Sequence, residues 1–353
     1  RKQQSICKLI DEVPSVKSLT VFSWDLSEED TNCIARFNLQ IHIQNNFSPN
    51  KFSDNFKKNI YGIDNFIGDI EELPDYTNLS YLGLGDYSGK TSLKSLAGIK
   101  NLSNLHINIR NVSNPEDISN LVYLKYLSIN CFEKKLSQVP FSLSERRCKK
   151  NFLTNINFLK ELKFLKGLNL SWNQISDLSP ISHMHSLHYL EIRHNLVNTL
   201  PALKDLNELK YLDIAANRLK NITNIKGASK LKLLNLAGNQ ITKIAEVSKL
   251  PNLTYLSIGN NPIADLEAFS PSPTLKILNL DSNAPFKYNL NIERDSTKVL
   301  LTIASSDEEK LWPEKLMYED MDTYVLNSPK GRNYLNISDL NIASLENLEA
   351  LSL

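Results

Sequence analysis

Six asparagines spaced 22 residues apart constrain the fold of this chain more than any other feature of its sequence. They are Asn173, Asn195, Asn217, Asn239, Asn261 and Asn283. Each follows the same frame, in which two apolar residues one position apart precede the asparagine, as in Leu190-x-Ile192-x-x-Asn195. Six matches in phase indicate a repeat architecture, in which short units stack side by side into a solenoid.

The frame predicts one short strand in each repeat, followed by a turn. Alternate residues of a strand point to the same side, so Leu190 and Ile192 are expected to face the core. The asparagine amide is expected inside the turn, where it bonds backbone groups that would otherwise be buried unpaired. Stacked asparagines would thus form a ladder. Residues such as Leu178 and Ile181 on the return segment would close the core from the convex side.

Strands of similar spacing extend the pattern beyond these repeats. Leu82, Leu105 and Leu127 start frames with nearly the same period, and weaker ones start at Leu19 and Leu39. The chain stops in what reads as one more strand, so we expect the full protein to continue beyond it. The expected organisation is degenerate repeats over 1–70, repeats over 71–283 with an insert at 131–150, an irregular segment over 284–334, and a resumed, truncated repeat over 335–353.

The repeat is identified as a leucine-rich repeat of the 22-residue class. It resembles the repeats of bacterial internalins and of eukaryotic protein-phosphatase regulatory subunits, and residues 173–181, Asn-Gln-Ile-Ser-Asp-Leu-Ser-Pro-Ile, are especially similar to an internalin repeat. The resemblance implies an α/β solenoid, namely a leucine-rich-repeat horseshoe with a parallel concave β-sheet and short convex turns or helices. It also implies a role in protein recognition, often at a host–microbe boundary.

Charge and hydropathy exclude two classes of function. The chain of 353 residues has 40 Lys+Arg against 39 Asp+Glu and a net charge of +1, so it lacks the basic excess of a general nucleic-acid binder. No apolar run approaches the roughly 18 residues that a membrane helix needs. The four cysteines have no CxxC spacing, which favours free thiols or structural disulfides over a metal site. They are Cys7, Cys33, Cys131 and Cys148.

Two motifs suggest chemistry at first sight. Gly85-x-x-x-Gly89-Lys90-Thr91 follows a predicted strand, but it is one residue short of phosphate-loop spacing and no long helix follows it. We interpret it as a repeat turn. Four clustered histidines are interpreted as surface residues, because the frame sends them to different sides. They are His183, His185, His188 and His194. We therefore predict no cofactor, no metal and no enzymatic activity.

Asn-x-Ser/Thr sequons are frequent in the chain. They start at Asn46, Asn78, Asn101, Asn111, Asn169, Asn221, Asn252 and Asn336. A chain this rich in Asn and Ser is expected to give several by chance, so we draw no inference of secretion from them.

The frame also predicts which side chains line the concave surface, since residues that flank the core positions point outward. An interrupted row of tyrosines occupies the position before the first core residue. Exposed Tyr, Trp and Arg are typical anchors of protein interfaces, although tyrosine is also simply a good strand former. The predicted partner-binding residues are Trp172, Tyr189, Glu191, Arg193, His194, Tyr211, Asp213 and Tyr255.

Two other segments are further candidates for a binding site. The insert at 131–150 holds two cysteines and a basic run, and it is either a functional excursion or a surface loop. The acidic segment 306–324 contains Trp312, and it is either a binding segment or an irregular cap of the solenoid.

We expect a non-enzymatic module for protein–protein recognition, in a bacterial protein that is secreted, displayed on the surface or translocated into a host. Its partner would be a protein, such as a host protein. One alternative is the substrate-recognition arm of a longer enzyme whose catalytic domain lies outside this chain. Another is an intracellular scaffold or phosphatase regulator, for which a cytoplasmic location and reduced cysteines are expected.

Overall fold

The structure, a computed structural model, describes two compact units of the chain. Unit 1 comprises the described residues up to Phe152 together with Asn157–Leu165, and unit 2 comprises Leu153–Ile156 and the described residues from Lys166 onward. The phosphate-loop-like segment, the insert beyond Cys131, the segment 306–324 and Asn283 lie outside the described residues. Described are residues 18–22, 26–37, 39–44, 53–84, 92–109, 112–131, 152–264, 269–270, 272–280 and 350–352.

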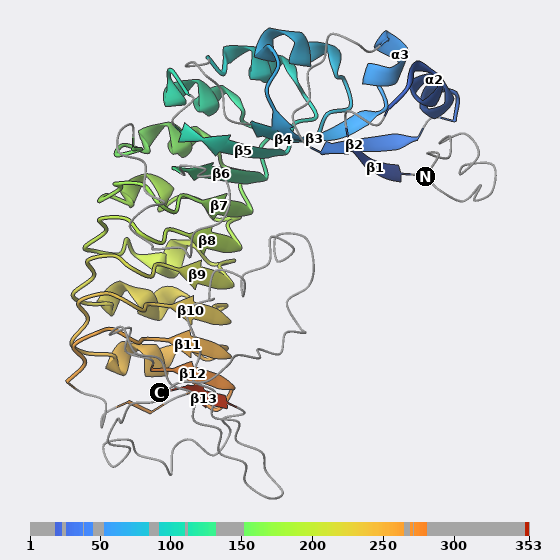
Figure 1. Cartoon of the computed structure of the whole chain (residues 1–353). Helices are drawn as coiled ribbons and strands as arrows, with labels where there is room; N and C mark the ends of the chain where they lie inside the picture. The colour runs from blue at the N-terminus through green and yellow to red at the C-terminus, as the bar shows by residue number, and fades with distance from the viewer. Residues whose placement is uncertain are drawn as a thin grey trace, which may run out of the picture. The chain divides into compact units, whose positions relative to one another are not determined.

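Unit 1 is a parallel sheet whose strands pair in chain order (Figure 1). Its described strands are β1 (Ser18–Phe22), β2 (Gln40–Gln44), β3 (Ile60–Phe66), β4 (Tyr81–Leu84), β5 (Asn104–Asn108) and β6 (Tyr126–Asn130). The connections form short helices, where η denotes a 3-10 helix. These are α2 (Glu28–Arg36), α3 (Asp54–Lys57), η2 (Ile70–Asp75), η3 (Lys94–Gly98), η5 (Pro115–Asn120) and η7 (Asn157–Glu161).

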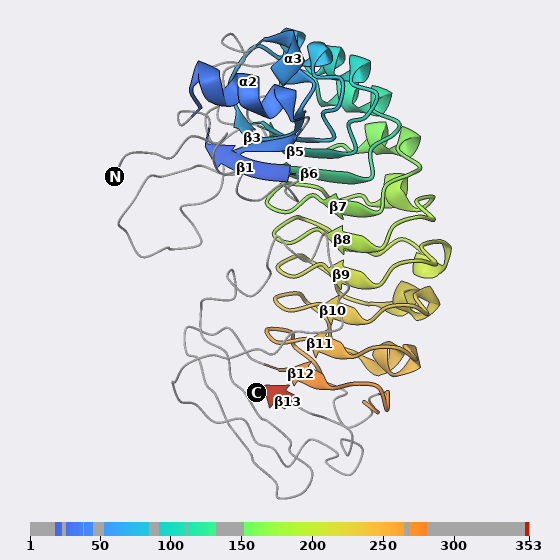
Figure 2. The ribbon, with the colours of Figure 1, turned by 90° about the vertical axis from the view of Figure 1, so that its right-hand side faces the viewer.

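Unit 2 repeats the same plan with shorter strands, which Figure 2 shows stacked in chain order. Its described strands are β7 (Gly167–Asn169), β8 (Tyr189–Glu191), β9 (Tyr211–Asp213), β10 (Leu233–Asn235), β11 (Tyr255–Ser257), β12 (Ile277–Asn279) and β13 (Ala350–Ser352). The return segments contain η8 (Ser179–Ile181), η9 (Leu203–Asp205), η10 (Thr223–Gly227) and η11 (Ala245–Lys249). The strand β13 pairs in parallel with β12, so the strand expected in the last residues is present.

The repeat frame explains the core of each unit. In the repeat of β8, Leu190 and Ile192 are buried, and Leu178, Ile181 and Leu187 of the preceding return segment are buried as well. Each repeat therefore closes its core with one strand and one short turn, and the remaining apolar edge is covered by the next repeat. The predicted fold class, a leucine-rich-repeat solenoid with a parallel sheet and short convex turns, is confirmed.

The frame asparagines of unit 2 bond the buried turns of neighbouring repeats. Asn217 Nδ2 donates to the carbonyl oxygens of Ile192, Ile214 and Ala215 at 2.8, 3.1 and 3.1 Å, and its Oδ1 accepts the N–H of Val197 at 3.0 Å. Each Oδ1 of the ladder thus binds an N–H that lies 20 residues earlier in the chain. The same acceptor bond is made by Asn173, Asn195, Asn239 and Asn261.

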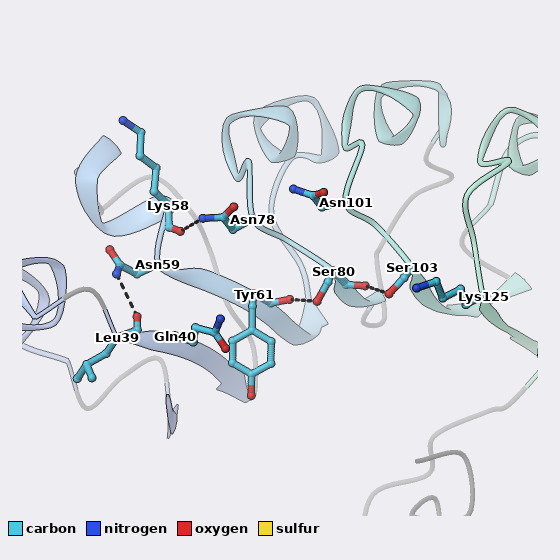
Figure 3. A pocket seen from close by; sticks show the side chains of 10 residues that line it. All are labelled: Leu39, Gln40, Lys58, Asn59, Tyr61, Asn78, Ser80, Asn101, Ser103 and Lys125. Carbon is cyan, nitrogen blue, oxygen red and sulfur yellow. Dashed lines mark hydrogen bonds between the residues drawn. The ribbon is translucent and has the colours of Figure 1, made fainter. Parts of the chain in front are cut away.

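A second set of polar side chains bonds the repeats where the strands begin. Asn78 Nδ2 donates to the carbonyl of Lys58 at 2.7 Å, and Ser80 Oγ donates to the carbonyl of Tyr61 at 3.1 Å (Figure 3). These side chains line a pocket of about 540 Å³ in unit 1. The same two bonds to the preceding repeat recur at Asn101 with Ser103 and at Asn252 with Thr254.

The first 70 residues also contain an α-helix, α2, whose N-terminus is capped. Ser27 Oγ accepts the N–H of Asp30 at 3.1 Å, and Asp30 Oδ2 accepts the N–H of Ser27 at 3.0 Å, which is a capping box. The helix buries Cys33 and Ile34. A local capping signal therefore produces a full α-helix where the repeats are least regular. Among the described residues, no helix is long and apolar enough to cross a membrane.

Two of the cysteines are oxidised in this structure. Cys33 and Cys131 are both disulfide-bonded, and both side chains are buried in unit 1. Of the two alternatives that the sequence leaves open, the disulfide therefore holds for these two residues.

Candidate functional site: the sheet of unit 2

The structure places all the predicted partner-binding residues in unit 2. The sheet register sets Tyr189 beside Tyr211 and Glu191 beside Asp213, on β8 and β9. Tyr255 lies on β11, where Leu233 of β10 separates it from Tyr211. The remaining three residues follow the strands β7 and β8 in the turns that lead to the ladder asparagines. They are Trp172, Arg193 and His194.

The expected exposure of this surface is wrong for three residues. Tyr211 is 1% exposed, Asp213 is 0% exposed and Trp172 is 8% exposed. Outward-facing side chains of a parallel sheet cover one another sideways, and the ring of Tyr211 lies 4.3 Å from that of Tyr189 at an angle of 9°. The half-buried members of the predicted set are Tyr189, Glu191, Arg193, His194 and Tyr255.

Glu191 is held by neighbours on its own strand and the preceding one. Its Oε2 accepts a hydrogen bond from the hydroxyl of Tyr189 at 2.5 Å and another from Asn169 Nδ2 at 2.8 Å. Asn169 in turn accepts the N–H of Ser171 through Oδ1 at 2.9 Å. The carboxylate therefore has a fixed position on the sheet.

Asp213 lies at the equivalent position of the next strand and is enclosed completely. Its Oδ1 accepts the N–H of Ala215 at 3.0 Å, and its Oδ2 accepts from Asn235 Nδ2 at 3.1 Å and from the Tyr211 hydroxyl at 3.4 Å. Arg193 Nε lies 3.6 Å from the same Oδ2. The buried acid is thus accompanied by a positive charge from the turn after β8, as a buried carboxylate requires.

Burial sets the electrostatics of this network. It raises the pKa of Asp213, against the opposing charge of Arg193. Burial also raises the pKa of Glu191, and the nearby negative charge of Asp213 raises it further. The pKa values of Tyr189 and Tyr211 lie well above the ordinary value for the same reason. Glu191 and Asp213 with Tyr189 and Tyr211 thus form one aromatic and acidic network, in which Tyr211 and Asp213 are buried.

Trp172 and His194 lie at a backbone position that is unusual for large side chains. Their φ values are 65° and 53°, in the left-handed region, and their rings stack with centroids 3.7 Å apart. The equivalent residues of the following repeats are Ala216, Gly238 and Asn260, which also have positive φ. Glycine and asparagine adopt this region readily, whereas a bulky residue there costs about 1–3 kcal/mol.

The clustered histidines separate as the frame predicts. His183 and His185 are exposed on the return segment of unit 2, and His185 Nδ1 lies 2.8 Å from the carbonyl oxygen of Asp205. His194 instead stacks on Trp172. Within the described ranges, no group of His, Cys, Asp or Glu is arranged to hold a metal ion.

A second polar and aromatic cluster, in unit 1, was not predicted from the sequence. It consists of His42, Tyr61, Asp64, Tyr81 and His106, with His42 Nε2 2.9 Å from Asp64 Oδ2. The signal was present, because His42 and His106 each stand between two buried residues of a strand, as Glu191 does in unit 2.

Comparisons with known proteins agree with the repeat frame. Residues 229–271 match a family model for two copies of the leucine-rich repeat, and residues 161–178 match a second leucine-rich-repeat model. No curated protein sequence gives a significant match.

Solved structures resemble the chain over most of its length. An internalin (inlF) from Listeria monocytogenes is 22% identical with a TM-score of 0.56, over 77% of this chain and 76% of that one. A leucine-rich-repeat protein from Leptospira interrogans is 22% identical with a TM-score of 0.55, over 79% and 76%. The plant peptide hormone receptor RGFR1, solved in complex with RGF2, is 21% identical with a TM-score of 0.50, over 79% of this chain and 46% of that one.

At these identities the structural matches establish a shared fold. The repeat frame, the asparagine ladder and the two family models point to the same family. The chain is a leucine-rich-repeat protein with an internalin-like fold.

Proposed function

We propose that this chain is a protein-recognition module, and that unit 2 binds its protein partner through the sheet surface around β8 and β9. Leucine-rich-repeat families serve in general as non-catalytic interaction modules. The observation that carries the proposal is the pair of ring stacks, Tyr189 on Tyr211 and Trp172 on His194. In each stack one ring is buried and the other is half-buried.

A stacked, half-buried ring is a favourable anchor for a partner. Its rotamer is fixed before binding, so little conformational entropy is lost when the partner covers it. The hydroxyl of Tyr189 is oriented by its bond to Glu191, which fixes the polar end of the ring as well. Interface hot spots are enriched in aromatic residues and arginine, and Arg193 directly precedes His194 in the chain.

The residue types at the Trp172 and His194 positions support the same proposal. All five repeats have a positive φ at this position, but the next three place alanine, glycine and asparagine there. The repeat turn therefore does not need a large ring, and the two stacked rings are additions to the frame.

We also propose that the protein functions outside the cytosol of its producer, as a secreted or surface-displayed bacterial protein that meets a host. The disulfides at Cys33 and Cys131 support this proposal, because such bonds persist in oxidising compartments and are rare in the cytosol. They disfavour the intracellular scaffold. Thiol titration of protein isolated from its natural source under alkylating conditions tests the point. Fully reduced cysteines would refute the extracellular assignment.

The binding proposal is tested by comparing three forms of the chain as bait for extracts of host-cell surface proteins. One is the unaltered chain, one carries Tyr189→Ala with Tyr255→Ala, and one carries Tyr123→Ala. Tyr123 is 66% exposed in unit 1 and provides a matched loss of one accessible tyrosine elsewhere. Circular dichroism verifies that all three forms are folded.

A protein captured by the unaltered chain and the control is expected to be lost from the double variant. With the captured protein purified, loss of one true anchor should weaken binding about 30-fold, corresponding to roughly 2 kcal/mol. If capture and affinity are the same for all three forms, the sheet surface of unit 2 is not the binding site.

A further inference from the structure

The cluster in unit 1 joins one carboxylate to four aromatic rings drawn from four neighbouring strands. His42 comes from β2, Tyr61 and Asp64 from β3, Tyr81 from β4 and His106 from β5. His42 Nε2 lies 2.9 Å from Asp64 Oδ2, and the Tyr81 side chain is hydrogen-bonded to the same carboxylate. All five side chains are half-buried, so each retains some accessible surface.

The rings form a row of tilted faces next to the carboxylate. The centroid of His42 lies 5.2 Å from that of Tyr81, and the centroid of Tyr81 lies 5.3 Å from that of His106. Tyr61 meets the His42 ring edge-on at 5.6 Å and an angle of 72°. Electron-rich aromatic faces of this kind attract a cation electrostatically, and more strongly when an anion lies beside them.

A glycine on β3 makes room for the row. Gly62 is the sheet partner of His42, and a Cβ placed on Gly62 would lie 2.4 Å from His42 Nδ1. The imidazole therefore occupies the space where any other residue would place its side chain. This space lets the ring lie across β3 and contact both Asp64 and Tyr81.

The carboxylate of Asp64 supplies the negative charge of the cluster. Burial acts to raise the pKa of Asp64, but the hydrogen bonds from His42 and Tyr81 outweigh it and hold that pKa below its usual value. Burial lowers the pKa of His106, which favours the neutral imidazole. The Asp64 side chain is 35% exposed, so its charge is accessible to a ligand.

In unit 2 a carboxylate has comparable neighbours, and there a guanidinium is among them. There Asp213 is surrounded by Tyr211, an amide and Arg193, whose Nε is 3.6 Å from the carboxylate. In unit 1 the carboxylate has tyrosine and histidine neighbours, and the basic side chain closest to Asp64 Oδ2 among the contacts described above is His42, whose Nε2 lies at 2.9 Å. The position that a guanidinium fills in unit 2 is thus occupied by a weaker base in unit 1.

We infer that this cluster binds an arginine side chain of a protein or peptide partner. A guanidinium is planar, stacks on aromatic faces and donates a fork of hydrogen bonds to a carboxylate, so it satisfies the rings and Asp64 together. A lysine ammonium would pair with the charge of Asp64, but it is not planar and would not stack on the row of rings. This surface lies in unit 1 and does not depend on the partner site proposed for unit 2.

The test uses the full chain with ¹³C-labelled histidine rings, titrated at pH 8 with Nα-acetyl-arginine methylamide. At this pH the carboxyl group of Asp64, whose pKa is lowered, is ionised. Nα-acetyl-citrulline methylamide is the uncharged control of the same shape, and Nα-acetyl-lysine methylamide tests a cation of different shape. Ring signals of His42 and His106, assigned with His42→Gln and His106→Gln, are followed by NMR.

Arginine is expected to shift both ring signals in a saturable way, with citrulline and lysine at least tenfold weaker. Asp64→Asn should abolish the response while keeping the shape of the side chain. Gly62→Ala should weaken it by displacing the His42 ring. Gly98→Ala is the matched control in unit 1, since its Cβ would meet only the Pro74 side chain, at 3.5 Å, and it should bind as the unaltered chain does.

Three results would overturn the inference. An equal response to citrulline, or an unchanged response in Asp64→Asn, would show that the carboxylate plays no part in binding. An equal response to lysine would overturn the assignment to a guanidinium. Because Asp64→Asn adds no atoms, the test stands even if Gly62→Ala fails to fold.

Discussion

Replacing one asparagine of the ladder measures how much the buried turn bonds contribute to stability. In Asn217→Ala, the N–H of Val197 loses the acceptor that binds it at 3.0 Å. The three carbonyls that Asn217 bonds keep a second donor each: Ile192 from Asn195, Ile214 from Asn239 and Ala215 from the N–H of His194. The substitution therefore leaves one buried N–H donor without an acceptor. It also removes three hydrogen bonds to carbonyl oxygens that keep another donor.

The expected loss of stability follows from that inventory. One buried unpaired N–H costs about 1–3 kcal/mol, and each lost bond to a still-paired carbonyl contributes less than the usual 1 kcal/mol or so. The total is roughly 3 kcal/mol. Asn261 makes the equivalent bonds but is only half-buried, so water replaces part of them in Asn261→Ala, and we expect less than half the effect.

Urea unfolding followed by the fluorescence of Trp172 measures both variants in unit 2, in a chain whose other two tryptophans, Trp24 and Trp312, are replaced by Phe. Exchange of the Val197 amide hydrogen should also lose its protection in Asn217→Ala. The reasoning is refuted if Asn217→Ala costs less than about 0.5 kcal/mol, which is the range of ordinary surface substitutions. It is equally refuted if Asn261→Ala costs as much as Asn217→Ala.

Three further predictions concern the electrostatics and the packing. The raised pKa of Glu191 means that the folded state binds a proton more readily, so stability falls as pH rises from about 4.5 through the folded pKa. Glu191→Gln should remove this dependence and be the more stable form at pH 7 in urea melts; an unchanged pH profile would contradict this. The lowered pKa of His106 has the opposite consequence, because the unfolded state takes up the proton first below about pH 6.5 and stability falls on acidification. In His106→Gln, urea midpoints at pH 7 and 5.5 should differ less than in the unaltered chain. Gly227→Ala would place a Cβ 2.6 Å from backbone atoms of the preceding repeat and should destabilise by about 1–3 kcal/mol, while Gly98→Ala, with 3.5 Å of room, should be near neutral in thermal melts.

The strands and turns of unit 2 could be predicted from the sequence because stacking requires each repeat to place the same frame positions in the core. A strand shifted by one residue would turn Leu190 and Ile192 outward, and a displaced Asn217 would strand a buried N–H. The repeat frame does not predict the contacts between outward-facing side chains of adjacent strands. Tyr211 and Asp213 were correctly placed on the outward side, yet their neighbours on adjacent strands, 22 residues away, bury them.

The cluster of unit 1 was missed for a different reason. The pairing of β2 with β3 shifts between Ile41 and His42, and the pairing of β3 with β4 shifts between Ile63 and Phe66. These irregularities change the spacing between repeats, so His42, Asp64 and Tyr81 do not fall at a constant interval. Only the three-dimensional register brings their side chains together.

The bonds where the strands begin also explain why the chain is rich in sequons. In Asn78-Leu-Ser80, Asn101-Leu-Ser103 and Asn252-Leu-Thr254, both the asparagine and the hydroxyl residue donate to the preceding repeat. In these three places the sequon follows from the hydrogen bonds that join one repeat to the preceding one. A glycan linked to such an asparagine would replace a proton on the Nδ2 that donates this hydrogen bond. It would also crowd the junction between neighbouring repeats. Production in a glycosylating secretory host is therefore expected to lower the yield of folded protein.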